Sequence, residues 1–170
     1  MRKLLLLKSV VDILFVLAMI GVIFMLPLIL MVAAIPEQVP FKFTSEIEMV
    51  AGRTQWELII SLVMVYVGYV FLVYGLFLFK KTLVLFQKRI IFDNRVIKNF
   101  DQMGKAILIG YFITLVPMIF FSLTENPVEV KLSFGLNESF LIVGLGLFFI
   151  VLSEVFQMGK NLKEESELTV

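Results

Sequence analysis

Four long apolar runs dominate the sequence and limit what the chain can fold into. The runs cover residues 10–34, 58–79, 106–123 and 139–156. Their only charged residues are Asp12 and Glu154. A helix that crosses the hydrocarbon of a bilayer needs about 20 mostly apolar residues, because each residue advances it by about 1.5 Å through about 30 Å. We therefore predict four transmembrane helices at these positions.

The composition agrees with a membrane protein. Hydrophobic residues make up 60% of the 170 residues and charged residues 17%, compared with about 45–50% and about 25% in soluble domains. The first run is longer than the 7–15-residue apolar core that is typical of a secretory signal peptide, so we expect it to be retained as a span. We predict an all-α membrane protein, with residues 1–170 as a single integral membrane domain that forms a four-transmembrane-helix bundle.

The Lys and Arg residues are distributed unevenly between the segments outside the runs. Three precede the first run, seven lie between the second and third runs, and two lie in the tail, so these segments hold twelve of the 15. With four spans the three segments share one side of the membrane. The positive-inside rule then predicts cytoplasmic termini, a cytoplasmic loop at 80–105 and a cytoplasmic tail at 157–170.

Two short segments on the opposite side alternate polar and apolar residues. They lie near residues 41–49 and 128–134. Such alternation over seven to nine residues is typical of a half-buried strand. We therefore predict a small extracytoplasmic β-element in which the two strands pair. Two independent loops along the lipid headgroups are the alternative.

The cytoplasmic segments combine charge with helical apolar spacing, and Asp93 or Asn94 is the expected N-cap of a helix that continues into the third span. We expect the cations of 80–105 to lie near anionic lipid headgroups, with docking of a soluble protein as the alternative. The acidic tail extends the apolar stripe of the fourth span, so we expect it to pack against the basic segment. The candidate interaction face consists of Arg95, Lys98, Phe100, Lys105, Phe156, Leu162, Glu164 and Glu165.

Asp12 and Glu154 are the two candidate carboxylates near the membrane boundary. A charge within a span is expensive to bury and is therefore a functional candidate. Both residues, however, come near the cytoplasmic boundary, where water or Lys8, Lys105 or Lys160 can reach them. We therefore expect them to cap and pair at the interface rather than to couple transport.

Small residues within the spans are candidates for close contact between helices. They are Gly68, Gly75, Ala106, Gly110, Gly144 and Gly146. The same positions could serve a homodimer, and the sequence leaves this open.

The sequence contains no His and no Cys, which removes the usual general base, thiol nucleophiles and the common zinc ligands. We expect no enzymatic activity, and hence no catalytic residue, no cofactor and no metal site. Direct nucleic-acid binding is not expected either.

The segment Phe92–Asn94, Gly104 and the ending "LKEESELTV" resemble the bacterial four-span proteins of domain-of-unknown-function family 2975. Members more often end in Leu-Thr-Ile, so the last residues depart from that pattern. The resemblance implies a bacterial inner-membrane protein that is frequently encoded beside a small helix-turn-helix DNA-binding regulator. It implies no activity and offers no catalytic residue.

Together these features predict a non-enzymatic membrane protein, either a regulator or a sensor, that binds a soluble cytoplasmic partner such as a helix-turn-helix regulator. A small transporter or channel subunit, or an immunity protein for self-protection, are the alternatives.

Overall fold

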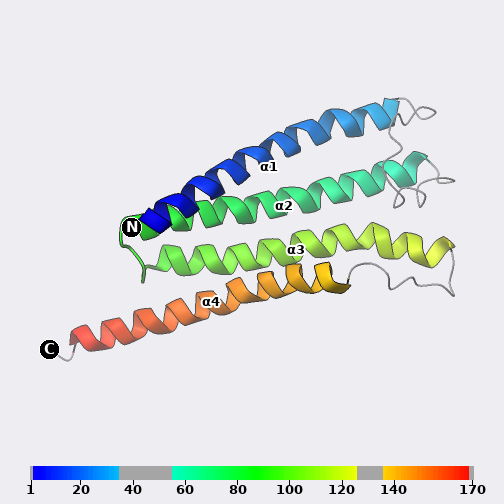
Figure 1. Ribbon diagram of the computed structural model, residues 1–170. Coiled ribbons are helices and arrows are strands. Elements are labelled where there is room, and N and C mark those ends of the chain that lie inside the picture. Colours follow the sequence, from blue (N-terminus) through cyan, green and yellow to red (C-terminus); the bar gives the residue numbers. More distant parts are fainter. Residues whose placement is uncertain (1, 35–54, 126–135, 169–170) are drawn as a thin grey trace.

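The computed structural model describes residues 2–34, 55–125 and 136–168, which form four long helices (Figure 1). The helices are α1 (Arg2–Ala34), α2 (Gln55–Gln87), α3 (Asn94–Glu125) and α4 (Leu136–Leu168). Three of them, α1, α2 and α4, are long and apolar enough to cross a membrane, while α3 carries charged residues in its first half. By the length and composition of its helices the chain is a multi-pass membrane protein.

The predicted fold class needs one correction. The described residues are all-α and contain no strand. The fold class is therefore all-α, and the predicted β-element is not part of it. The two predicted strands, 41–49 and 128–134, lie outside the described residues. Their prediction depended on short alternating patterns alone, and an isolated pair of short strands is at best marginally stable.

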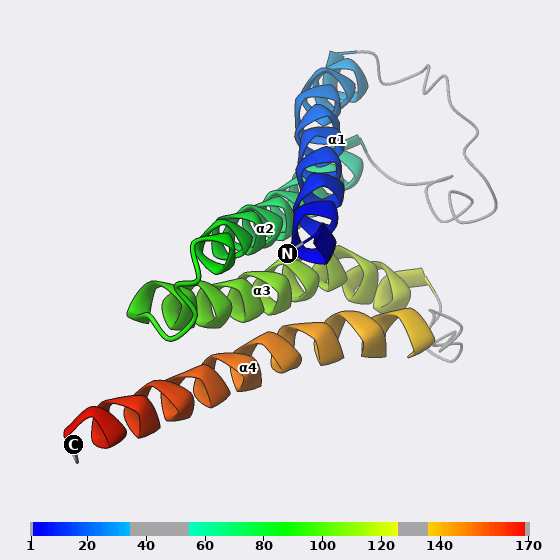
Figure 2. The ribbon, with the colours of Figure 1, turned by 60° about the vertical axis from the view of Figure 1, so that its left-hand side comes forward.

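The four helices form a row in chain order, with α1 on α2, α2 on α3 and α3 on α4 (Figures 1 and 2). The chain direction reverses from each helix to the next. The start of α1, the turn between α2 and α3 and the end of α4 therefore lie at one end of the molecule (Figure 1). We call this the charged end, comprising residues 2–12, 80–105 and 154–168.

The row is more open than the predicted bundle, because α1 packs chiefly against α2. Among the described residues of α1, Val11 is the one that is buried. An almost uniformly apolar helix has no preferred face to turn toward protein. Lipid tails solvate such a helix as well as other side chains do, so burial against protein brings little gain.

The hydrophobic core lies between α2, α3 and α4, close to the charged end. Its buried members are Leu78, Leu85, Val96, Phe100, Met103 and Ile107. The ring centroid of Phe100 on α3 lies 6.0 Å from that of Phe149 and 5.3 Å from that of Phe156, both on α4. The ring of Phe86 on α2 stacks on Phe156 at 5.8 Å. Aromatic contacts therefore join three helices in this half of the molecule.

A tight turn connects α2 to α3. The Ile90 amide donates to the Leu85 carbonyl at 3.1 Å and the Arg89 amide to the Phe86 carbonyl at 3.0 Å, which is the hydrogen-bond pattern of a Schellman cap. Arg89 has a φ of 59°, a left-handed conformation that glycine usually supplies. At the start of α3, Asp93 Oδ1 accepts a hydrogen bond from the Arg95 amide at 2.8 Å. Of the two predicted N-caps, Asp93 is therefore the one that is used.

Candidate functional site

The first candidate carboxylate, Asp12 of α1, forms an ion pair with Lys80 of α2. The Asp12 Oδ1 to Lys80 Nζ distance is 3.0 Å, and both side chains are about one-third exposed. The same Nζ lies 5.0 Å from the ring centroid of Phe15. Lys80 was not among the lysines expected to reach this carboxylate. It does so because α1 packs on α2 and brings residues 12 and 80 to the same level.

Two further contacts join α1 to α2. The Tyr69 hydroxyl donates a hydrogen bond to the Ala18 carbonyl at 3.1 Å. Phe15 and Phe77 have ring centroids 5.9 Å apart. Sequence reasoning did not identify these partners, because each residue belongs to an apolar run whose orientation the pattern does not fix.

The second candidate, Glu154 of α4, is exposed and has no hydrogen-bond or ion-pair partner among the described residues. Its neighbour Ser153 donates a hydrogen bond to the Ile97 carbonyl of α3 at 2.8 Å. Ile97 lies six residues before Met103, whose side chain and carbonyl lie close to Gly75 of α2. Glu154 is therefore at or beyond the level of Lys80, toward the charged end.

The structure divides the predicted interaction face into a buried and an exposed set. Phe100 is 2% exposed and Phe156 is half-buried, so both belong to the core and not to an accessible surface. The remaining members are exposed: Arg95, Lys98, Lys105, Leu162, Glu164 and Glu165.

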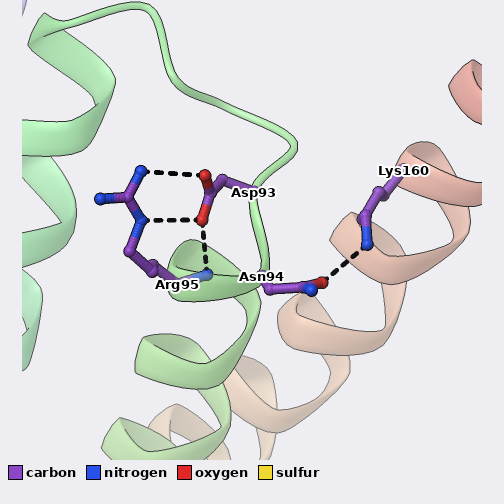
Figure 3. A network of polar contacts seen from close by, with 4 residues as sticks. All are labelled: Asp93, Asn94, Arg95 and Lys160. Atoms are coloured by element: carbon purple, nitrogen blue, oxygen red, sulfur yellow. Dashed lines mark hydrogen bonds and ion pairs between the residues drawn. The ribbon is translucent and has the colours of Figure 1, made fainter.

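Polar contacts join the start of α3 to α4 (Figure 3). The Asp93 carboxylate accepts two hydrogen bonds from the Arg95 guanidinium, each at 3.0 Å. Hydrogen bonding from Arg95 lowers the pKa of Asp93 to about 2, and the same pairing raises the pKa of Arg95. Separately, Lys160 of α4 donates to Asn94 Oδ1 at 2.8 Å. The basic segment and the tail thus meet near Lys160, and the ring of Phe92 also lies close to Gly159 there.

Beyond Lys160 the last part of α4 projects past the other helices (Figures 1 and 2). We call residues 157–168 the α4 extension. Every residue from 161 to 168 is exposed. Two ion pairs run along it, from Lys160 to Glu164 at 3.3 Å and from Lys163 to Glu167 at 3.6 Å. The tail therefore contacts the basic segment only near its beginning.

Glycines allow the helices to approach closely at two crossing points. A methyl group added at Gly68 would lie 2.7 Å from the carbonyl oxygen of Gly110, where α2 crosses α3. One added at Gly104 would lie 2.5 Å from the carbonyl oxygen of Gly146, where α3 crosses α4. Gly146 was among the proposed packing residues, whereas Gly104, its neighbour on α3, was not.

The other proposed packing residues have different surroundings. Ala106 is buried, at 4% exposure. A methyl group at Gly75 would make an ordinary contact with Ile107, at 3.4 Å. At Gly144 it would meet no atom within 4 Å, so Gly144 marks no helix crossing among the residues that the structure describes.

Within the same described ranges, no three or more His, Cys, Asp or Glu side chains form a group that could hold a metal ion.

Comparison with known proteins gives one match. Residues 46–170 match a family described as "Protein of unknown function (DUF2975)". The match covers more than half of the chain and confirms the resemblance that the sequence showed. No curated protein and no solved structure matches the chain.

Proposed function

The chain belongs to the DUF2975 family, and we propose that it is a non-enzymatic protein of the bacterial inner membrane that binds a soluble cytoplasmic partner through the α4 extension. In this proposal the charged end lies in the cytoplasm. The match brings no activity with it, so the proposal depends on the physical properties of the residues at that end.

The two ends of α2 support this placement in the membrane. Trp56, near the start of α2, is 74% exposed, and Lys80 and Lys81 lie 24 and 25 residues further along. At about 1.5 Å per residue this separation is roughly 36 Å, which is close to the thickness of a bilayer with part of its headgroup regions. Tryptophan is typical of the membrane interface, and lysines favour the cytoplasmic one.

The observation that carries the proposal is the exposed apolar stripe leading into and along the α4 extension. Val155, Met158 and Leu162 follow one another at helical spacing and are each more than half exposed. In lipid such exposure needs no explanation. On a helix that has left the membrane it is typical of a face that a partner covers.

Charge indicates the kind of partner. From Glu154 to the end of the chain, four Glu residues accompany two Lys residues. An acidic helix with an apolar stripe is complementary to a basic, amphipathic surface. A small DNA-binding regulator has such a surface, because it must contact phosphates.

Site-specific photocrosslinking in cells tests the proposal. A photoreactive amino acid at Leu162 is expected to give an adduct with a soluble protein, whereas the same probe at Leu145, an exposed apolar residue within the fourth span, is expected to give none. Adding Met158→Ser next to the Leu162 probe should reduce the adduct, and Asn161→Ser should not. No soluble adduct at Leu162, or the same adduct at Leu145, would contradict the proposal.

No specific observation favours the transporter or immunity alternatives. Asp12 is already paired with Lys80, and Glu154 lies at or beyond the level of that pair. A carboxylate that couples an ion to transport is expected nearer the middle of the membrane.

A further inference from the structure

The contacts between helices place the charged residues of α1, α2 and α3 on a common scale of depth. Lys80 pairs with Asp12, so these two residues lie at one level. Gly75 lies beside Met103 and Ile107, which relates α2 to α3. Because a helix advances about 1.5 Å per residue, the depths of other residues follow by counting from these contacts.

Cations at the deepest levels of the charged end are paired. Lys80 is held by Asp12 at 3.0 Å. Lys105 lies between Met103 and Ile107 in sequence, so it is roughly 7 Å deeper than Lys80, and it is held by Asp101 at 2.7 Å. Pairing reduces the cost of placing a charge near hydrocarbon. These two ion pairs therefore need no further partner.

Three lysines just outside this level have no carboxylate partner among the described residues. Lys81 follows Lys80 directly, Lys8 precedes Asp12 by one turn, and Lys98 precedes Met103 by five residues. All three lie within about 6 Å of the level of Lys80, on the side away from the hydrocarbon. They belong to three neighbouring helices, α1, α2 and α3, and lie at a similar depth; we call them the lysine belt.

Of the cations still further out, three have carboxylate partners, whereas Lys3, Lys88 and Arg89 have none among the described residues. Arg95 pairs with Asp93, Lys160 with Glu164 and Lys163 with Glu167. The lysine belt is thus the unpaired positive charge that lies nearest the hydrocarbon, because Lys3, Lys88 and Arg89 lie roughly 12 Å or more further out than Lys80. Its depth is where the phosphates of a lipid leaflet lie, directly outside the hydrocarbon.

We propose that the lysine belt of Lys8, Lys81 and Lys98 binds the headgroup phosphates of anionic phospholipids. The lipid supplies the negative charge that no described side chain provides. The belt thereby gives the protein a preference for anionic over zwitterionic lipid and fixes the depth of the helices in the leaflet. This inference is independent of the soluble partner proposed above.

Native mass spectrometry of the full chain in detergent tests the proposal, with phosphatidylglycerol and phosphatidylcholine supplied in equal amounts. The wild-type protein should retain phosphatidylglycerol preferentially. The variant K8Q/K81Q/K98Q should lower the ratio of retained phosphatidylglycerol to phosphatidylcholine on the order of a hundredfold, or about fivefold for each lysine. If the triple variant does not fold, the single variants K81Q and K98Q test the same prediction, and each should lower this ratio about fivefold.

The control variant R95Q/K160Q/K163Q removes the same number of charges from paired positions and should keep most of the preference. An equal loss in both variants would show that net charge alone attracts the lipid and would overturn the belt. No loss in K8Q/K81Q/K98Q would overturn it as well. Inorganic phosphate at millimolar concentration should leave the lipid bound, and displacement by phosphate would instead indicate a site for the free anion.

Discussion

Asp93 supports the start of α3 with both its cap and its charge. Its carboxylate accepts a hydrogen bond from the Arg95 amide and two from the Arg95 guanidinium. Because this pairing lowers the pKa of Asp93 from 3.8 to about 2, the carboxylate favours the folded state above about pH 4. That contribution is lost as the pH falls from 4 through 2.

The variant Asp93→Asn retains an oxygen that can cap the helix but loses the charge. We expect it to melt at a lower temperature than wild type at pH 6, with a difference that shrinks toward zero as the pH is lowered to 2. Asp93→Ala, which also loses the cap, should melt lower than Asp93→Asn over the whole range. Melting temperatures in detergent measured at each pH provide the test. A difference between wild type and Asp93→Asn that does not vary with pH would contradict the role of the charge.

Partners of single residues were the hardest feature to predict from sequence. The N-cap of α3 could be narrowed to Asp93 or Asn94, because capping is local. The partner of Asp12 could not be predicted in this way, because Lys80 is close to Asp12 only through the packing of α1 on α2. Long-range pairs depend on which face each helix presents, and uniformly apolar runs carry no information about faces.

Helices α3 and α4 meet at a crossing whose closeness depends on Gly104 and Gly146. Gly104→Ala places a methyl group against the Gly146 carbonyl, so the two backbones must move apart. We expect this variant to lose about 1–3 kcal/mol in free energy of unfolding. Gly144→Ala is the matched control on α4, because its methyl group meets nothing within 4 Å. It should leave stability unchanged or raise it slightly, since alanine favours a helix.

Unfolding in mixed micelles measures both glycine variants under the same conditions. Equal effects at Gly104 and Gly144 would show that the crossing point does not limit the approach of α3 to α4.

At the scale of elements the sequence predicted the helices well and their ends poorly. Each apolar run lies within one helix, but the helices continue beyond the runs, as α2 does to Gln87. Apolar length reports the part of a helix that suits lipid, whereas a helix ends where its caps do. The cap of α2 was not predictable, because Arg89 occupies the left-handed position where glycine is the usual signal.

At the scale of the whole molecule, the sequence predicted the relative directions of the four helices but not how closely they pack together. Counting Lys and Arg placed the two termini and the 80–105 loop on one side, and the row of antiparallel helices brings these segments to one end (Figure 1). The openness of the row was not predicted, because lipid competes with protein for apolar surfaces and the sequence does not record the outcome.

The proposed function requires that the charged end faces the cytoplasm. The sequence contains no Cys, so single cysteines placed at Lys3, Arg89, Leu168 and Gln38 can each be tested with a membrane-impermeant maleimide in intact and permeabilised cells. We predict that cysteines at 3, 89 and 168 are labelled only after permeabilisation and that the cysteine at 38 is labelled in intact cells. Labelling of any of the first three in intact cells would contradict this topology.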